Sequence, residues 1–342
     1  MANDIIYRLS KSYGDCGLVL CLGAGVSAAS GIPDWRELLR RVGAVVFAGS
    51  GGAGIIDRLL ADGYSLPAVA GIVEAQSGSQ MKGHHFAELI RNALYRELAM
   101  QSPTPDQNEM TDFADETKQR NPTLRAVAAL CVTRDQNTGC FGANHRIRAI
   151  INLNYDALLR SYIRYRYGAI LVRTIERPDA VPKPDRIPVY HPHGFLHFNH
   201  KYCGDLDSET PDQLVLTEQN YFDFFSRPLS LFTYTMLFLM REHPFLFIGT
   251  KLKDDNIRRL LHYSKQERLA GFDRRGKRTE SLADRHFAIL RRKTSAAMNR
   301  LTEASLRRLG VRVIWTNAHD DIPLILKSVY ESDGMSRWAD VF

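Results

Sequence analysis

The chain has 342 residues, of which 44% are hydrophobic and 24% are charged, a composition typical of a soluble globular protein with one large or two modest domains. Its net charge of +7 permits contact with nucleic acid but does not argue for it. No apolar run reaches the roughly 18 residues of a membrane helix, and the N-terminus has no signal-peptide pattern. We therefore expect a cytoplasmic protein with no membrane partner.

The cysteine pattern argues against zinc and against disulfides. The five cysteines are scattered, and no two are three positions apart: Cys16, Cys21, Cys131, Cys140 and Cys203. A structural zinc site usually draws on closely spaced Cys pairs, so we expect reduced thiols, no zinc ribbon and no other metal site. The densest basic cluster, residues 265–278, is interpreted as a solvated loop.

The first half of the chain combines one strand with a series of helices. We predict a lead-in helix over 4–13, a buried strand over 18–22 and a helix over 35–47. Further predicted helices cover 55–62, 66–76, 83–101 and 122–132, and the polar, acidic stretch 101–119 is interpreted as a surface loop. Residues 51–143 are therefore predicted to form a helical insertion subdomain.

The second half alternates between strands and helices. Predicted strands lie at 147–154, 169–174, 244–250, 286–290 and 311–315, with helices beginning at 157, 219, 254, 294 and 322. This alternation favours an α/β fold with a Rossmann-like, doubly wound parallel sheet, formed by residues 1–50 and 144–342 around the insertion.

The turn after the first strand is suited to a phosphate. Gly23 and Gly25 follow the apolar run, and small residues continue to Gly31. A strand that leads through small residues into a helix brings backbone N–H groups and the helix dipole close to a pyrophosphate. The Gly-x-Gly spacing alone is a weak signal, and a tight turn without a ligand explains it equally well.

Two later strand ends carry polar side chains, at the edge where α/β proteins place their sites. Asn154 and Asp156 follow the strand that begins near Ile147, although an Asp there also suits a helix cap. A histidine cluster at 191–197 follows another extended segment, and His193 is the candidate functional histidine in it.

Four motifs in order resemble the sirtuin family, the NAD-dependent silent information regulator proteins. Gly23-Ala-Gly-Val-Ser27 with Ser30-Gly-Ile-Pro-Asp-Trp-Arg36 is similar to the family signature, with Trp35 where the family usually has Phe. Asn154-Tyr-Asp156 resembles the end of the Thr-Gln-Asn-Ile-Asp motif. His193-Gly194 resembles the His-Gly pair, and Gly249-Thr-Lys251 resembles Gly-Thr-Ser with Lys in place of Ser.

The variant residues resemble a divergent branch of the family. The Tyr in Asn154-Tyr-Asp156 and the pattern Leu216-Thr-Glu-x-x-Tyr221 look like the sirtuin-like proteins of bacterial antiviral defence. The protein-deacylating sirtuins usually carry a four-cysteine zinc module, which this sequence cannot build. The resemblance thus implies an antiphage or anti-plasmid effector that hydrolyses NAD+ when triggered.

The resemblance also implies roles for individual residues. NAD+ is the substrate, and the residues expected to bind it are Gly23, Ala24, Gly25, Ser27, Pro33, Asp34, Trp35, Arg36, Gly249, Thr250 and Lys251. The expected catalytic residues are Asn154, which orients a water molecule, His193, which acts as a base, and Asp156, which contacts the nicotinamide carboxamide.

Two other functions remain open at this stage. An NAD-dependent protein deacylase would need a channel for acyl-lysine, and a nucleotide sensor would bind NAD+ without turnover, with Leu153 and Lys251 as its inactivating changes. A toxic hydrolase needs restraint, so by analogy we expect a homo-oligomer and a separate regulatory partner, either an ATPase or a nucleic-acid-guided protein.

Overall fold

The structure is a computed structural model that describes residues 2–78, 84–99, 120–168, 170–176, 180–197, 214–226, 231–273, 284–334 and 337–342. The expected surface loop at 101–119 and Cys203 lie outside these residues.

The centre of the fold is a seven-stranded parallel sheet in the order β5-β6-β4-β1-β7-β8-β9. Its strands are β1 (Leu18–Leu22), β4 (Ile147–Asn152), β5 (Val172–Ile175), β6 (Ile187–Tyr190), β7 (Phe245–Ile248), β8 (His286–Arg291) and β9 (Val311–Thr316). Every residue of β1 is buried, because this apolar strand has β4 on one side and β7 on the other. The predicted Rossmann-like, doubly wound sheet is confirmed.

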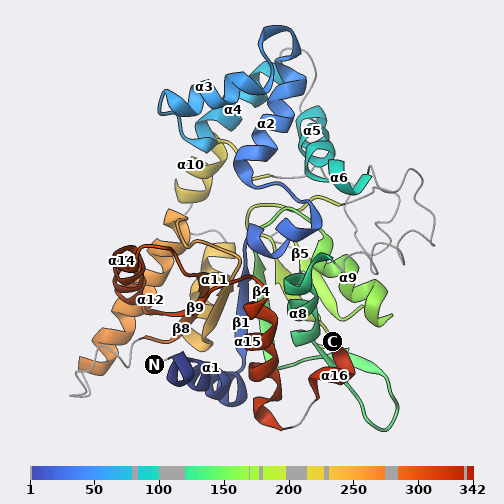
Figure 1. The fold of residues 1–342 in the computed structure, drawn as a ribbon, viewed down its shortest axis with the longest axis vertical. Helices are drawn as coiled ribbons and strands as arrows, with labels where there is room; N and C mark the ends of the chain where they lie inside the picture. The colour runs from blue at the N-terminus through green and yellow to red at the C-terminus, as the bar shows by residue number, and fades with distance from the viewer. Residues whose placement is uncertain are drawn as a thin grey trace.

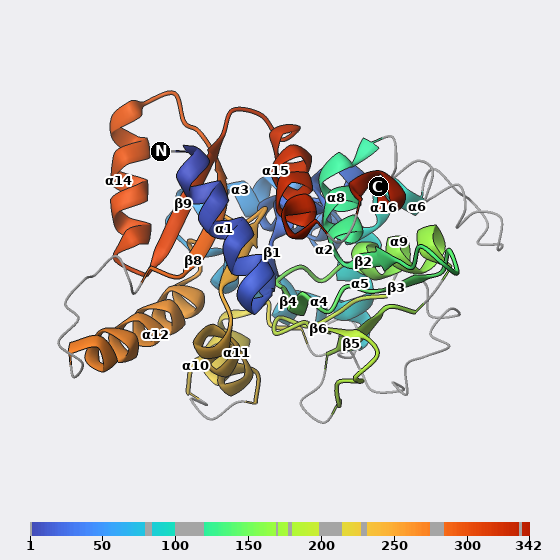
Figure 2. The same cartoon turned by 90° about the horizontal axis from the view of Figure 1, so that it is seen from below.

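Helices cover both faces of the sheet, as Figure 2 shows. One hydrophobic core lies under α1 (Ala2–Cys16), α8 (Pro122–Leu130), α9 (Leu158–Tyr167) and α15 (Asp321–Tyr330). The other lies under α11 (Leu231–Glu242), α12 (Asp255–Asp273) and α14 (Ala296–Arg307). The C-terminal helix α16 (Trp338–Val341) packs near the small hairpin formed by β2 (Val132–Arg134) and β3 (Phe141–Ala143).

A group of helices stands above the carboxyl ends of the strands (Figure 1). It comprises α2 (Trp35–Val46), α3 (Ala53–Ala61), α4 (Leu66–Gly78), α5 (His84–Leu94), α6 (Arg96–Ala99) and α10 (Glu218–Ser226). Helix α2 packs against α3, α4 and α5, and α10 packs against α4. The division into a sheet domain and an insertion at 51–143 stays a proposal; within that range α8 packs beside the sheet, against α9 and α15.

Three local predictions were wrong. The turn after β1 does not lead directly into an α-helix: two short 3-10 turns, Ala24–Val26 and Ala28–Ser30, come before α2, so the turn is not itself the N-terminus of an α-helix. The helix predicted over 83–101 breaks near Tyr95 into α5 and α6. The basic cluster is not all loop either, because Lys265 is buried on α12, where it pairs with Asp284.

Candidate functional site

The candidate site lies where the strand order reverses. From β1 the chain first builds the β4, β6 and β5 side of the sheet, and it then crosses to β7 on the other side of β1. Loops that follow neighbouring strands diverge at such a switch point, and ligands of open α/β sheets bind in the resulting crevice. The carboxyl ends of β1, β4, β6 and β7 carry the four motifs found in the sequence.

The turn after β1 packs tightly against the turn after β7. Gly25 N–H donates to the carbonyl of Gly249 at 2.8 Å. A Cβ atom on Gly25 would lie 2.8 Å from Gly249 Cα, and one on Gly23 would lie 2.7 Å from Thr250 Cβ. Gly249 itself adopts a φ of 70°, which favours glycine. These glycines are therefore required for backbone packing between two site loops, whether or not they also approach a ligand.

Asn154 joins the end of β4 to this turn. Its Nδ2 donates to the carbonyl of Gly23 at 3.1 Å and to Ser27 Oγ at 3.3 Å. Ser27 is almost fully buried. Both amide hydrogens of Asn154 are thus used within the protein, whereas no described residue donates to Oδ1, which leaves that oxygen as an acceptor.

Asp156 is a buried carboxyl group that is only partly satisfied. Its Oδ1 accepts the Leu158 N–H at 3.1 Å, and its Oδ2 has no hydrogen-bond partner among the described residues. Burial raises the pKa of Asp156 above its usual value, and the nearby Ser27 hydroxyl and backbone N–H groups offset this in part. The Ser27 hydroxyl lowers the pKa of Asp156 because it lies near the carboxyl group, although the two groups do not meet with hydrogen-bond geometry. A buried acceptor of this kind is suited to a donor from a ligand.

Two histidines after β6 are held against the end of β4. His191 Nδ1 lies 3.1 Å from the carbonyl oxygen of Asn154, and His193 Nδ1 lies 3.3 Å from that of Leu153. Burial lowers the pKa of His191 to about 4, so this side chain is neutral at pH 7. The contact of His193 favours the tautomer with hydrogen on Nδ1, which makes Nε2 its basic nitrogen.

An aromatic pair covers His193. The Trp35 and Tyr221 rings stack with centroids 5.9 Å apart and planes at 17°, and the Tyr221 ring lies 6.1 Å from that of His193. Trp35 Nε1 is buried without a hydrogen-bond partner among the described residues. Burial, followed by the nearby Asp254 carboxylate, raises the pKa of Tyr221, so Asp254 also borders this cluster.

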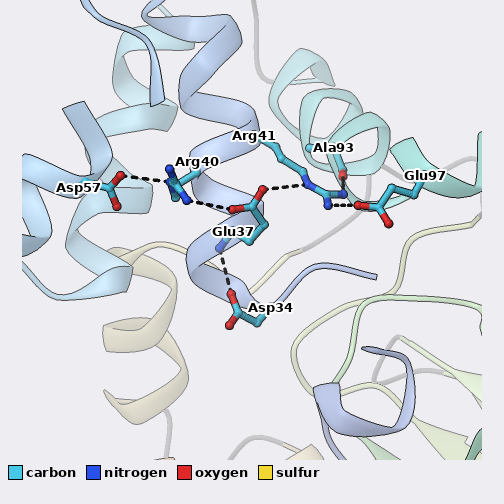
Figure 3. Close-up of polar contacts among 7 residues, drawn as sticks. All are labelled: Asp34, Glu37, Arg40, Arg41, Asp57, Ala93 and Glu97. Atoms are coloured by element: carbon cyan, nitrogen blue, oxygen red, sulfur yellow. Dashed lines mark hydrogen bonds and ion pairs between the residues drawn. The ribbon is translucent and has the colours of Figure 1, made fainter. Parts of the chain in front are cut away.

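Helix α2, which carries Trp35, is fixed by a chain of polar contacts (Figure 3). Asp34 caps the helix by accepting the Glu37 N–H at 3.0 Å. Arg41 joins α2 to α5 and α6, because it pairs with Glu37 and Glu97 and donates to the carbonyl of Ala93. The helical group therefore sets the position of the indole over the site.

The remaining predicted residues lie at the edges of the site. Pro33 is half-buried, whereas the side chains of Arg36 and Lys251 are exposed. No hydrogen bond or ion pair joins those two side chains to the other candidates in the described part of the chain. Thr250 Oγ1 accepts the Leu252 N–H at 3.2 Å and so shapes the turn after β7. The exposed cations remain available to a ligand or to solvent.

The sequence analysis missed two residues that brace the site. Asn121 is fully buried, and its Nδ2 donates to the carbonyl of Val26 at 2.8 Å and to Ser30 Oγ at 2.9 Å. The Tyr95 hydroxyl accepts the Ala157 N–H at 2.8 Å and donates to the carbonyl of Leu196 at 2.6 Å. Asn before Pro122 signals a helix cap, which its Oδ1 provides to Leu124, but no sequence signal marks its contact with the phosphate turn.

Metal and membrane features are absent from the described residues. Within them, no group of three or more His, Cys, Asp or Glu side chains is arranged to hold a metal ion. Burial raises the pKa of the Cys21 and Cys131 thiols, which makes both side chains inert. None of the described helices combines the length and apolar character needed to cross a bilayer.

The fold and the position of the site define a Rossmann-like α/β protein with a crevice at the switch point of its sheet. A family model described as the SIR2-like domain matches residues 148–314, which run from β4 into β9 and include Asn154, His193 and Gly249. Residues 148–314 therefore contain a SIR2-like domain, and the domains of this sirtuin-like family use NAD+. No curated protein gives a significant match to the chain.

Proposed function

We propose that this chain hydrolyses NAD+ to nicotinamide and ADP-ribose. The observation that carries the proposal is the meeting of polar side chains at neighbouring strand ends, where Asn154 and Asp156 lie beside the turn after β1 and His193 lies against the end of β4. The family's use of NAD+ supplies the substrate class. The cysteine pattern, which offers no zinc module, favours hydrolysis over the deacylase alternative.

The proposed binding mode assigns each part of NAD+ to one set of residues. The backbone of the turn bearing Gly23, Ala24, Gly25 and Ser27 binds the pyrophosphate, and Gly249, Thr250 and Lys251 border it, with Lys251 as an exposed cation. Pro33, Asp34, Trp35 and Arg36 form the loop near the nicotinamide ribose. The unpaired Oδ2 of Asp156 accepts a hydrogen bond from the nicotinamide carboxamide.

The proposed reaction breaks the bond between the ribose anomeric carbon and the pyridinium nitrogen. The bonding electron pair leaves with neutral nicotinamide, so no acid is needed, and the transition state has oxocarbenium character. A water oxygen forms the new bond to the anomeric carbon, and its proton passes to His193 Nε2 and then to solvent. Asn154 Oδ1 accepts from this water and orients it, because its Nδ2 is already committed to Gly23 and Ser27.

The biological setting is proposed from the resemblance to divergent sirtuin-like proteins. In it, the chain is a cytoplasmic effector of antiphage or anti-plasmid defence that depletes NAD+ when triggered. Residues 1–50 and 144–342 form the catalytic domain, and 51–143 form the insertion. The protein is a homo-oligomer restrained by a separate ATPase or nucleic-acid-guided partner.

The test is NAD+ consumption by the purified chain, with ADP-ribose, cyclic ADP-ribose and nicotinamide separated by chromatography. Wild type should release nicotinamide and linear ADP-ribose in equal amounts, and His193→Ala should not. A matched control is His262→Ala, which removes an exposed histidine of α12 and should leave turnover unchanged. Deacylation of an acyl-lysine peptide would overturn the hydrolase proposal in favour of the deacylase.

Because a restrained enzyme could give the same result as an inactive one, NAD+ binding is measured in parallel by calorimetry. Binding without turnover, in the isolated chain and after addition of candidate partners, would favour the sensor. Absence of binding in the folded protein would contradict both readings.

A further inference from the structure

The side chain of Tyr95 joins the group of helices above the sheet to the segments that carry the candidate site. Tyr95 lies between α5 and α6 (Figure 1), and only 3% of its surface is exposed. A buried hydroxyl group must find its hydrogen-bond partners within the protein. That of Tyr95 accepts the Ala157 N–H at 2.8 Å and donates to the carbonyl of Leu196 at 2.6 Å. One oxygen atom therefore holds two backbone groups that are distant in the sequence.

These two backbone groups belong to the segments with the proposed catalytic residues. Ala157 directly follows Asp156 in the segment after β4, and Leu196 comes shortly after His193 in the segment after β6. Ala157 is 4% exposed and Leu196 is 0% exposed, so solvent cannot replace the Tyr95 hydroxyl at either group. The hydroxyl thus fixes the Asp156 segment and the His193 segment against each other.

The two segments also contact each other directly. The Leu196 N–H donates to the carbonyl of Tyr155 at 2.7 Å, and His193 Nδ1 lies 3.3 Å from the carbonyl oxygen of Leu153. These contacts act between the two segments, whereas the bonds from Tyr95 tie both of them to a third element, the chain between α5 and α6.

The same stretch of chain is tied to α2 on both sides of Tyr95. Arg41 Nη1 donates to the carbonyl of Ala93 at 3.2 Å, and the Arg41 guanidinium pairs with Glu97 (Figure 3). Helix α2 begins at Trp35, which lies over the site. A continuous set of contacts therefore runs from the indole through Arg41 and Tyr95 to both catalytic segments.

We infer that Tyr95 is a positioning residue for the proposed hydrolysis of NAD+, on which this inference rests. Its hydroxyl keeps Asp156 and His193 at the spacing that the carboxamide acceptor and the base require, and it fixes both relative to Trp35. The hydroxyl hydrogen is committed to the Leu196 carbonyl, so the group acts through the backbone and not on the substrate. A displacement of reacting groups by about 1 Å can lower a rate about 10²-fold, so a small loss of position has a measurable effect.

The first test is Tyr95→Phe, which keeps the ring and removes only the hydroxyl. The Ala157 N–H and the Leu196 carbonyl lose their partner, so kcat for NAD+ should fall about 10- to 100-fold. The Kd of NAD+ from calorimetry should rise less than about threefold, because the turn after β1, which binds the pyrophosphate in the proposal, is braced by Asn121.

The matched control is Tyr167→Phe, which also removes a buried hydroxyl from a backbone carbonyl. Tyr167 is 5% exposed, and its hydroxyl donates to the carbonyl of Val341 at 2.7 Å, between α9 and α16. Urea denaturation should show a loss of stability in both variants, whereas kcat in Tyr167→Phe should stay within about twofold of wild type. Equal losses of kcat in the two variants, or no loss in Tyr95→Phe, would overturn the inference.

A second pair of variants tests the link to α2. Arg41→Gln removes the ion pair with Glu97 and should lower kcat about two- to tenfold. Its matched control is Arg40→Gln on the same helix. Arg40 pairs with Glu37 and Asp57, and among the described residues it has no ion pair with α5 or α6, so kcat should stay unchanged. A loss of kcat in Arg40→Gln as large as that in Arg41→Gln would contradict the link.

Hydrogen exchange separates this inference from the proposed function, because it needs no turnover. Exchange of the Ala157 N–H, followed by mass spectrometry, should be at least about tenfold faster in Tyr95→Phe than in wild type and unchanged in Tyr167→Phe. If this pattern is found but wild type binds and consumes no NAD+, the hydrolase proposal fails and the placement of the two segments by Tyr95 stands. Unchanged exchange at Ala157 in Tyr95→Phe would overturn the inference, whatever the turnover.

Discussion

Two buried aspartates lie at opposite ends of the sheet and differ in their polar partners. At the amino end, Asp284 accepts from Lys265 Nζ at 3.0 Å and from Arg307 Nε at 3.3 Å, and Lys265 is itself buried. At the carboxyl end, Asp156 has one oxygen bonded to a backbone N–H and one without a partner among the described residues. Burial raises the pKa of Asp156, and no cation in the described part of the chain offsets this.

We propose that the difference separates a charge that is paired within the fold from a polar group that is available to a ligand. A buried ion pair whose hydrogen bonds are complete has no donor or acceptor left for a ligand. A buried oxygen with no donor is a cost to folding that a bound molecule can remove. The same contrast extends to Trp35 Nε1, which is also buried without a partner among the described residues and lies above the same cluster. Four measurements test whether the two ends of the sheet differ in this way.

The largest expected effect is on catalysis at the carboxyl end. His193→Ala removes the proposed base, so NAD+ turnover should fall about 10² to 10⁴-fold. Because the His193 side chain is buried, the free energy of unfolding is measured beside turnover, so that loss of the base is separated from loss of the fold. Single-turnover kinetics and urea denaturation measure the two quantities. Turnover within threefold of wild type would remove His193 from the mechanism.

At the amino end the large effect should be on stability. Asp284→Ala removes the carboxylate that pairs with the buried Lys265 ammonium. This should lower the free energy of unfolding by about 3–5 kcal/mol. Urea denaturation at pH 7 measures the change. The control Asp62→Ala removes an exposed carboxylate at the end of α3 and should change stability by less than about 0.5 kcal/mol. Equal losses in the two variants would contradict the structural role of Asp284.

Asp156→Asn should give the reverse pattern to Asp284→Ala. Asparagine keeps an oxygen to cap Leu158 and removes a poorly compensated acid, so stability at pH 7 should stay within about 1 kcal/mol of wild type or increase. NAD+ turnover should fall about 10- to 100-fold, the usual loss for one hydrogen bond to a charged group. A large loss of stability with normal turnover would place Asp156 with Asp284, as a structural group.

The smallest expected effect is on the pH dependence of stability. The folded-state pKa of Asp156 is raised, so folding favours its protonated form. The resulting stabilisation is fully present below the unfolded pKa of about 4 and is lost as the pH rises through the folded pKa. The free energy of unfolding of wild type relative to Asp156→Asn should therefore decrease over that range and then become constant. A relative stability that increases with pH would show that the carboxylate is compensated after all.

The sequence predicted the parts of the molecule that depend on local pattern. Strands β1, β4 and β7 are short apolar runs that end in polar or glycine residues, and each was placed within a few residues of its position. The family was predicted from the same strand ends and is confirmed by the matching SIR2-like domain. The roles of Asn154, Asp156 and His193 stay predictions, although the structure holds Asn154 and Asp156 beside the turn after β1 and His193 against the end of β4.

What the sequence left out depends on contacts between distant segments. The hydrogen bond from Asn121 to Val26 spans 95 residues, and nothing in the local pattern of either segment specifies the other. The burial of Lys265 depends on Asp284, which begins the next strand segment, so charge composition alone suggested a solvated loop. The first 3-10 turn after β1 packs against Gly249, and the second lies beside Asn121, so both depend on distant segments.

The central position of β1 has a consequence for synthesis of the protein. This strand leaves the ribosome long before its two neighbours in the sheet, because its Val19 pairs with Ala149 of β4 and with Phe245 of β7. Such high contact order delays closure of the sheet until β7 has been translated. The turn after β1 has no Gly249 to pack against before then, so a nascent chain carries the crevice in an unassembled form until that point.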